Sequence, residues 1–375
     1  MNPLRLGLIG CSSTAAARQI KTIQSLPGVV LSGVFDADPD ARASAVGSVS
    51  TTTACRDCST VDELVASDLV DAVIIHTSLA DRVSHVCQAI DAGLHVLVER
   101  PLASTAADAR QLVDRHLAHQ TKGARTVFAV NLTMRVRPVW TKVAELIDSG
   151  KLGQIVRVHW TLADQFRANS FYAAQPGRGT FKHDGGGLLL NQYHANLDLL
   201  THLLGSPTHV NALVKFGRFH PIEVEDEVFA TLEYASGAHA SIVASTAEPM
   251  GSNRLEIVGT LAMLRVTGGR AIEMVVPNSD MNAQLRSDNA FGERQVTVDE
   301  IPANSSPVDE TLEGLKAFVA AMKNKKAHPT PAADNLTTIQ VANAILLSGV
   351  RKRRVGMPVD ANEYAEVFQG LCGPR

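Results

Sequence analysis

The stretch Leu4-Arg5-Leu6-Gly7-Leu8-Ile9-Gly10-Cys11-Ser12-Ser13-Thr14-Ala15 decides the fold of this chain. An apolar run typical of a buried strand ends at Gly10, and a helical pattern over residues 12–23 begins at once. Glycine allows the tight turn, and the free N–H groups of the helix N-terminus can then bind a pyrophosphate. Any strand-to-helix turn also needs a glycine, so the turn alone leaves a purely structural reading open. The residues that we expect to contact a dinucleotide here are Gly10, Ser12, Ser13 and Thr14.

The same alternation of strand and helix continues through the first third of the chain. Four more apolar strands, separated by helical segments, are predicted at residues 29–35, 70–75, 94–98 and 126–130. Continuous apolar strands between helices indicate a parallel sheet with helices on both faces. With right-handed crossovers, this is an α/β doubly wound Rossmann domain, which we assign to residues 1–130.

The rest of the chain, residues 131–375, has a different pattern. Its strands are longer and alternate between apolar and polar residues, as in an antiparallel sheet with one face on helices. We expect an α+β domain with a large, mostly antiparallel sheet, and a homo-oligomer formed through the open face of that sheet. Helices are predicted at residues 139–148, 188–204, 309–322 and 336–351, and strands at 155–162, 208–216, 227–234, 238–244, 254–258 and 263–266.

The composition excludes several classes of protein. Among 375 residues, 35 Lys+Arg against 38 Asp+Glu give a net charge of −3, whereas nucleic-acid and anionic-membrane binders need a basic surplus. No apolar run reaches the ~20 residues that span a bilayer, and the N-terminus does not resemble a signal peptide. Five cysteines without framework spacing favour a reducing, cytoplasmic compartment. Cys55 and Cys58 lack a partner pair, so we expect no metal site.

Asp36 ends the second predicted strand, about 20 residues beyond the glycine turn. An acidic residue at this place binds the adenosine ribose hydroxyls of a dinucleotide. Its charge would repel the 2′-phosphate of NADP, and the nearest basic residue is Arg42. The sequence therefore favours NAD over NADP. A helix N-cap is the structural alternative, but Asp38 before Pro39 serves that role better.

Two further segments carry polar residues where ligands bind in such folds. Glu99-Arg100 ends the fourth strand, at the carboxyl edge of the predicted sheet. Three glycines, residues 185–187, precede the predicted helix 188–204, and they suggest close approach of backbone to a ligand. On an ideal helix, Asn191, His194, Ala195 and Asp198 would lie about one turn apart on one face.

On these motifs the chain resembles the Gfo/Idh/MocA oxidoreductases, the family of glucose–fructose oxidoreductase, inositol dehydrogenase and rhizopine-catabolism proteins. The resemblance extends over roughly residues 4–365. It implies a Rossmann domain followed by a domain with a large, mostly antiparallel sheet, and oxidation or reduction of a ring hydroxyl or ketone with NAD(P). The segments that carry it are residues 7–15, 77–101, 135–138, 145–153, 185–198 and 224–227.

The resemblance also implies where catalysis takes place, and the chain departs from the family there. The catalytic lysine of the family, in a Glu-Lys-Pro motif, falls at Arg100, and the catalytic histidine falls at Ala195. A guanidinium stays protonated, so Arg100 can only orient the substrate or stabilise an alkoxide. His194 titrates near neutrality, and a π-bulge would bring it to the site as general base.

Other expected site residues also come from the resemblance. Thr77 begins a segment where the family has Thr-Pro-x-x-x-His, and here that histidine is replaced by Arg82. Arg167 and Asn191 match one branch of the family. The expected set is therefore Asp36, Thr77, Glu99 and Arg100 for the cofactor, Arg167, Tyr193 and His194 for the substrate, and His194, Arg100 and Asn191 for catalysis.

Taken together, these features predict an NAD-dependent dehydrogenase or ketoreductase acting on a sugar, cyclitol, glycoside or related ring. Two alternatives remain open because the departures cluster at the nicotinamide side. One is a lyase, isomerase or hydrolase that oxidises its substrate transiently on bound NAD. The other is a redox-inactive sugar-sensing or partner subunit that has lost the catalytic groups.

Overall fold

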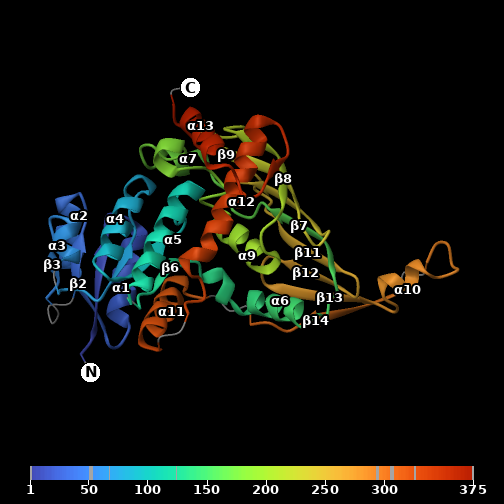
Figure 1. The fold of residues 1–375 in the computed structure, drawn as a ribbon, viewed down its shortest axis with the longest axis horizontal. Helices are drawn as coiled ribbons and strands as arrows, with labels where there is room; N and C mark the ends of the chain where they lie inside the picture. Colours follow the sequence, from blue (N-terminus) through green and yellow to red (C-terminus); the bar gives the residue numbers. More distant parts are fainter. Residues whose placement is uncertain are drawn as a thin grey trace. The chain divides into compact units, whose positions relative to one another are not determined.

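The computed structural model describes residues 2–49, 54–66, 68–123, 125–292, 295–304, 308–324 and 327–373. The chain folds into two compact units (Figure 1). The first consists of Met1–Thr133 and Val308–Ile339, and the second of Met134–Pro307 and Gln340–Arg375. The first division lies three residues from the predicted boundary at 130/131. Residues 308–339, which we assigned to the second domain, pack in the first unit.

The first unit contains the predicted doubly wound sheet. Its strand order is β3-β2-β1-β4-β5-β6, and every described pairing is parallel. The strands are β1 (Leu4–Ile9), β2 (Val29–Phe35), β3 (Arg56–Asp57), β4 (Ala72–Ile75), β5 (His95–Glu99) and β6 (Phe128–Asn131). The helices are α1 (Thr14–Ser25), α2 (Pro39–Gly47), α3 (Val61–Val65), α4 (Leu79–Asp91), α5 (Ala106–Thr121) and α11 (Glu310–Asn324). The predicted α/β class is therefore confirmed.

Helix α11 belongs to the first unit because its apolar side packs on α1. Leu315 and Phe318 are fully buried in the same apolar cluster as Ile20 and Ile23 of α1. Burying these side chains stabilises the packing by about 1.5–3 kcal/mol each. Sequence periodicity predicts the helix but not which sheet it covers, and this explains the difference in domain assignment.

The second unit is built on a nine-stranded sheet in the described residues, with the order β14-β13-β12-β11-β7-β10-β9-β8-β15. The pairing of β10 with β7 is parallel, and the others are antiparallel, as predicted. The strands are β7 (Ile155–Leu162), β8 (His209–Phe216), β9 (Glu225–Glu233), β10 (His239–Ser245), β11 (Asn253–Gly259), β12 (Met263–Thr267), β13 (Ala271–Pro277), β14 (Val296–Ile301) and β15 (Val355–Gly356).

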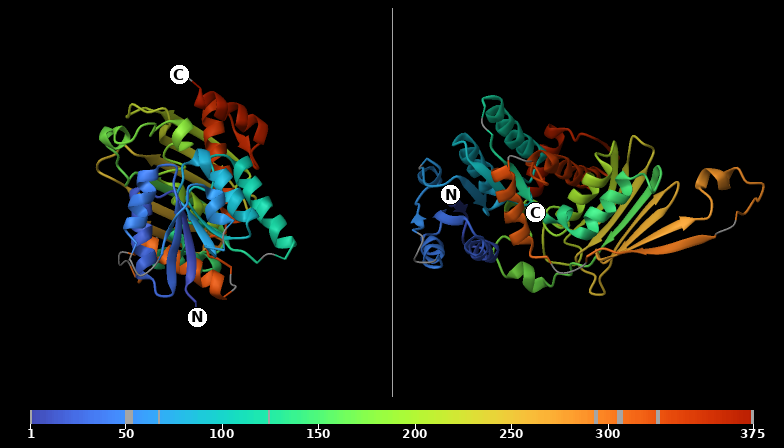
Figure 2. Two further views of the ribbon diagram at one scale, coloured as in Figure 1. Left: turned by 90° about the vertical axis from the view of Figure 1, so that its left-hand side faces the viewer. Right: turned by 90° about the horizontal axis from the view of Figure 1, so that it is seen from below.

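Helices cover one face of this sheet, and the other face is open (Figure 2). The covered face is apolar, with Trp140 of α6 packed on Trp160 of β7. The open face is not uniformly apolar: Leu213 and Phe229 are exposed, but Arg157, Arg254 and Arg265 all pair with Glu256. The helices are η1 (Thr133–Val136), α6 (Pro138–Asp148), α7 (Asn169–Ala173), α8 (Phe181–Asp184), α9 (His194–Leu204), α10 (Met281–Leu285), α12 (Ala332–Arg351) and α13 (Ala361–Cys372). Helix α12 begins in the first unit, which includes residues 332–339, and continues in the second.

Several features of the second unit differ from the sequence prediction, which did not include α7, α8, α10, α13 or β15. The predicted helix 188–204 begins only at His194, because residues 188–192 form turns. Strands β13 and β14, which the sequence did not predict, form a hairpin that extends from the sheet and carries α10 (Figure 2). Among the described residues, no helix combines the length and the hydropathy that crossing a membrane requires.

Candidate active site

The turn after β1 is shaped by contact between two strand ends. Gly10 has a φ of +88°, and an added Cβ would lie 2.9 Å from the carbonyl carbon of His76. Only glycine fits this position, because the backbone after β4 leaves no room for a side chain. The Ser13 hydroxyl then caps α1 by accepting a hydrogen bond from Ala16 N at 3.0 Å. Ser12, Ser13 and Thr14 are exposed at the helix N-terminus, where a pyrophosphate can bind.

Asp36 directly follows β2, and its carboxylate stabilises this turn by accepting hydrogen bonds. Its Oδ2 accepts hydrogen bonds from the backbone N–H groups of Cys11 at 2.7 Å and Ser12 at 3.0 Å. Its Oδ1 accepts one from Asp38 N at 3.0 Å. Burial raises the pKa of Asp36, but these donors outweigh it, so the pKa lies below its usual value. The carboxylate is therefore ionised and retains acceptor capacity on Oδ1 for a ribose hydroxyl.

The nearest basic group to Asp36 is already engaged. Arg42 donates from Nη1 to the backbone carbonyl of Asp36 at 2.8 Å and from Nε to Asp57 at 2.6 Å. Its guanidinium is thereby held at the same end of the sheet as the expected adenosine site. Because Arg42 is bonded to Asp57 and to the Asp36 carbonyl, it is not available in this structure to bind a 2′-phosphate. This agrees with the predicted preference for NAD.

A cluster of three polar side chains lies at the carboxyl ends of β4, β5 and β6. Asn131 donates from Nδ2 to Oε1 of Glu99, and that oxygen lies 3.9 Å from Nε2 of His76. The His76 side chain is 4% exposed, and its Nε2 has no hydrogen-bond partner among the described residues. Burial lowers the pKa of His76, and the positive charge of Arg82 adds to this, while Glu99 opposes it. The ring is therefore neutral near pH 7.

This cluster lines a pocket of about 570 Å³ in the first unit. The predicted residue Arg100 is exposed and also lines it, as do Arg18 and Asp309. The buried Thr77 Oγ1 has no hydrogen-bond partner in the described part of the chain. Unpaired buried polar atoms beside the glycine turn indicate groups that a ligand would satisfy, so the residues present fit a bound dinucleotide.

His76 is the residue of this site that sequence reasoning missed. It directly follows the apolar run of β4, so its position at the carboxyl edge was available from the pattern. What the pattern did not contain is the Glu99–Asn131 pair beside it, because β4, β5 and β6 meet only in the folded sheet. A histidine at a strand end is unremarkable until a partly buried carboxylate is found next to it.

Arg82, at the place of the family's histidine, links the ends of β4 and β5. It is 6% exposed and donates to the backbone carbonyls of Thr77 at 2.6 Å and Glu99 at 2.9 Å, and to that of Pro101. Burial lowers its pKa to about 10, so it stays charged. Charge-assisted bonds of this kind are roughly twice as strong as neutral ones. Arg82 therefore fixes the backbone from which Thr77, Glu99 and Arg100 project.

In the second unit, the segment with the three glycines packs against Glu225, and its predicted contact with a ligand stays a prediction. Gly185, with a φ of +68°, ends α8. An added Cβ at Gly187 would lie 2.1 Å from the carbonyl oxygen of Glu225. The Glu225 carboxylate accepts hydrogen bonds from Gly187 N at 2.8 Å and Leu189 N at 3.1 Å. Gly187 is therefore needed for close packing on the start of β9.

The residues after these glycines also depart from the expected helix. Asn191 lies in a turn and donates from Nδ2 to the backbone carbonyls of Gly186 at 2.7 Å and Gly187 at 3.1 Å. Tyr193 N donates to the carbonyl of Leu188 at 2.8 Å, a bond that spans five residues as in a π-bulge. The predicted single helix face from Asn191 to Asp198 is therefore wrong, because the helix begins at His194.

His194 is buried, with no exposed surface, at the start of α9. Four residues later, Asp198 forms a buried bidentate pair with Arg135, with both distances 2.7 Å. This pair anchors α9 inside the second unit. The wide turn lies before the helix and not within it, and the proton-transfer role of His194 stays a prediction.

The expected substrate residues Arg167 and Tyr193 are connected through Gln165. The Tyr193 hydroxyl accepts a hydrogen bond from Gln165 N at 3.1 Å and donates to the carbonyl of Ser245 at 3.2 Å. Arg167 donates from Nη2 to the Gln165 side chain at 3.2 Å. His220 Nε2 donates to the carbonyl of Arg167 at 2.9 Å. Tyr193 thus positions the segment that carries Arg167.

The predicted site residues therefore form two sets, one in each unit. The first unit brings together Gly10, Ser12, Ser13, Thr14, Asp36, Thr77, Glu99 and Arg100, and the second brings together Arg167, Asn191, Tyr193 and His194. That the two sets act on one substrate stays a prediction. All five cysteines are free thiols, and the described residues contain no group of metal-binding side chains.

Comparisons with known proteins agree with the two-domain fold. Residues 4–127 match the oxidoreductase family with an NAD-binding Rossmann fold, and residues 140–265 match the GFO/IDH/MocA C-terminal domain. The chain is 25% identical to an uncharacterized oxidoreductase of Rhizobium meliloti, over 94% of this chain and 98% of that protein. It is 27% identical to 1,5-anhydro-D-fructose reductase of Ensifer adhaerens, over 88% of this chain and 90% of that protein.

Among solved structures, the WlbA dehydrogenase of Bordetella pertussis in complex with NADH and UDP-GlcNAcA has the same fold. Its TM-score is 0.76 at 22% identity, over 96% of this chain and 100% of that chain. At this identity the likeness shows the fold alone. Matches to both the Rossmann and the C-terminal models of one family, together with the two sheets described above, identify the chain as a member of the Gfo/Idh/MocA oxidoreductase family.

Proposed function

We propose that this protein is an NAD-dependent oxidoreductase that acts on a hydroxyl or keto group of a sugar, cyclitol, glycoside or related ring. The observation that carries the proposal is the carboxyl edge of the first sheet. There, an ionised Asp36, a glycine turn and a buried imidazole beside a carboxylate belong to one unit. Open α/β sheets bind dinucleotides at this edge.

Different residues of the first unit are proposed to bind the adenosine and the nicotinamide parts of NAD. Exposed N–H groups at the start of α1 suit the pyrophosphate, and the Asp36 carboxylate suits the adenosine ribose. Thr77, Glu99 and Arg100 are proposed to contact the nicotinamide end. When bound, the nicotinamide would accept or supply a hydride. The protein has to place the substrate carbon beside it and move one proton.

We propose that His76 moves this proton. It is neutral near pH 7, has an available Nε2 and lies beside Glu99, which would stabilise the imidazolium that forms. Arg100 stays charged and is proposed to hold the substrate oxygen. His194, predicted from the sequence for the same role, is the second candidate because it lies next to the family's histidine position. Variants of His76 and His194 distinguish the two candidates.

The substrate would be held from the second unit by Arg167 and Asn191, with Tyr193 acting through Gln165. The similarity to 1,5-anhydro-D-fructose reductase supports a polyhydroxylated ring as substrate. We further propose a cytoplasmic homo-oligomer formed through the open face of the second sheet. The exposed Leu213 and Phe229 on that face support the proposal.

One experiment tests the proposed function. The purified protein is incubated with NAD⁺ or NADH and a panel of sugars, cyclitols, glycosides and their ketones, and both the nicotinamide absorbance and the organic products are followed. Net change of nicotinamide with formation of a ketone or alcohol supports the proposal. Product without net nicotinamide change favours transient oxidation by a lyase, isomerase or hydrolase. Binding without any product favours a partner subunit.

A further inference from the structure

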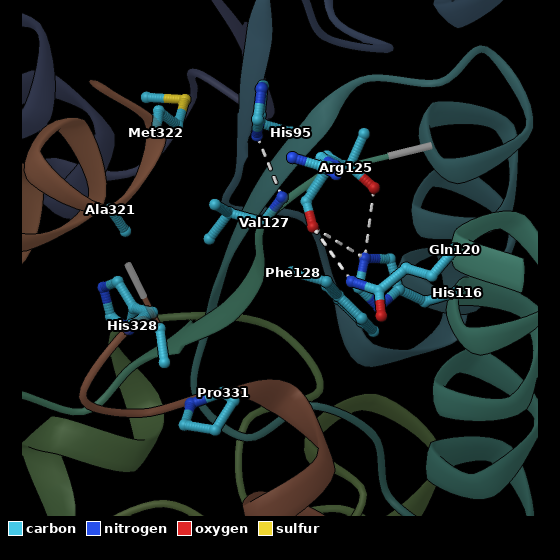
Figure 3. Close-up of a pocket in the computed structure, with 12 residues that line it drawn as sticks. His95, His116, Gln120, Arg125, Val127, Phe128, Ala321, Met322, His328 and Pro331 are labelled. Atoms are coloured by element: carbon cyan, nitrogen blue, oxygen red, sulfur yellow. Dashed lines mark hydrogen bonds between the residues drawn. The ribbon is translucent and has the colours of Figure 1, made fainter. Parts of the chain in front are cut away.

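A second pocket lies in the first unit, at the opposite edge of the sheet from the glycine turn. Its volume is about 580 Å³. His95 begins β5 and Phe128 begins β6, so the pocket lies at the amino ends of these strands, whereas Glu99 and Asn131 end them at the other edge. Figure 3 shows α5 with His116 on one side and Ala321, Met322 and His328 on the other. We expect both the cofactor and the substrate at the other edge.

Backbone hydrogen bonds fix the tautomers of two histidines in this pocket. Val127 N donates to Nδ1 of His95 at 2.9 Å (Figure 3), and Thr330 N donates to Nδ1 of His328 at 3.1 Å. Burial lowers the pKa of both rings, that of His328 to about 4, so both are neutral near pH 7. In each ring the single proton is therefore on Nε2, which becomes a donor.

The donor of His328 is unsatisfied. His328 is only 7% exposed, and its Nε2 has no hydrogen-bond partner among the described residues. A buried donor left unpaired costs about 1–3 kcal/mol. Such a group beside a cavity is typical of a site that a ligand or a water completes.

The rest of the lining determines what kind of ligand fits. Arg125 contributes a guanidinium, and no carboxylate occurs among the lining residues that the structure describes. Phe128, Met322 and Pro331 supply an apolar wall. His116 Nε2 is engaged with the backbone carbonyl of Thr126 at 3.2 Å and does not compete. The pocket therefore offers hydrogen-bond donors and a positive charge together with apolar surface.

We propose that this pocket binds a small organic anion, whose carboxylate or phosphate group accepts hydrogen bonds from Nε2 of His328 and from Arg125, with its apolar part against Phe128 and Met322. This site is separate from the NAD site and does not depend on the proposed redox function. Carboxylates and phosphates share the oxyanion chemistry, and the experiment distinguishes them.

The test uses the full-length protein with isotope-labelled histidine and follows the imidazole NMR signals during titration. The probes are inorganic phosphate, acetate and butyrate, with sodium chloride at matched ionic strength. We expect saturable shifts of the His328 and His95 signals with at least one probe. Butyrate should bind more tightly than acetate if the head group is a carboxylate. His119, on the same helix α5 but paired with Asp91 outside the pocket, should not shift.

Two variants make the test decisive. His328→Phe fills a similar volume without a donor and should weaken binding by about tenfold or more, the size of one hydrogen bond to a charged group. Arg125→Gln changes an exposed side chain, so it keeps the fold and should weaken binding as well. NAD affinity should be unchanged in both. The proposal is overturned if the unmodified protein shows no saturable shifts. It is also overturned if both variants bind the probes as tightly as the unmodified protein does.

Discussion

The carboxylate of Asp36 accepts a hydrogen bond from the backbone N–H of Cys11 at 2.7 Å. The residue expected to bind the adenosine ribose and the turn expected to bind the pyrophosphate are therefore one connected structure. A change at Asp36 alters both the charge that a 2′-phosphate would meet and the support of the turn.

We predict that NAD binds more tightly than NADP, and that Asp36→Ala narrows the difference by about tenfold or more. The like-charge repulsion with a 2′-phosphate is lost, while NAD also loses a hydrogen-bond acceptor for its ribose. Titration of both cofactors in oxidised and reduced forms measures this. Asp40→Ala, an exposed acid on α2 that does not contact the turn, is the control. Equal or tighter NADP binding by the unmodified protein contradicts the prediction.

The second prediction concerns proton transfer. In the oxidation direction the base must be neutral, and burial holds the pKa of His76 below its usual 6.5. Activity should therefore rise with pH, with its midpoint below that value, and then level off. His76→Gln should remove this rise and lower turnover by roughly a hundredfold while NAD still binds.

The matched variant for this test is His194→Ala. If His194 is the base, as the sequence predicted, that variant instead lowers turnover by roughly a hundredfold and removes the pH rise. Full activity of His76→Gln, with an unchanged pH profile, would exclude His76.

The third prediction is that Arg100 holds the substrate and moves no proton. Arg100→Met should raise KM by about tenfold or more, because a charge-assisted hydrogen bond to the substrate oxygen is lost. The pH at which activity appears should not change. Arg100→Lys keeps the charge and should retain most of the binding. Loss of one limb of the pH profile in Arg100→Met would contradict this role.

The fourth prediction tests the link that Arg82 makes between β4 and β5. Arg82→Met leaves three backbone carbonyls without their donor, so the free energy of unfolding should fall by about 2–4 kcal/mol. NAD affinity should fall as well, because Thr77 and Glu99 lose their fixed backbone. Urea denaturation and NAD titration measure the two effects. Arg110→Met, an exposed residue of α5, should change neither.

The fifth prediction tests whether Gly187 is required for packing against Glu225 or for contact with a ligand. Gly187→Ala places a Cβ against the Glu225 carbonyl, so it should lower the free energy of unfolding by about 3 kcal/mol or more. Gly47→Ala, in α2 with no atom near its Cβ, should change it by less than about 1 kcal/mol. If Gly187→Ala instead leaves stability unchanged and weakens only substrate binding, the glycine serves a ligand.

The sequence predicts the first sheet well because parallel strands are buried on both faces and appear as continuous apolar runs. The same reasoning fails for β14, because its residues are exposed from Val296 to Glu300 and its apolar–polar alternation extends only over residues 296–299. It also fails for residues 188–190, where three buried leucines suggest a helix. Their backbone instead bonds to Glu225, a residue far away in the chain, and no local pattern contains that partner.

The candidate site divides in the same way. Asp36 was predictable because its place at a strand end is a property of the local sequence. His76 was not, because its significance depends on Glu99 and Asn131 in neighbouring strands. Arg82 explains a departure from the family pattern: a long buried cation occupies the histidine position and binds three carbonyls.

The position of Arg42 has a consequence for the evolution of cofactor choice. Its guanidinium already lies at the adenosine end of the sheet, where Asp57 and the Asp36 carbonyl restrain it. Replacing Asp36 with serine would keep an acceptor for the turn and remove the negative charge, and replacing Asp57 would release the cation. We therefore expect two substitutions, at Asp36 and Asp57, to be enough to weaken the predicted preference for NAD over NADP.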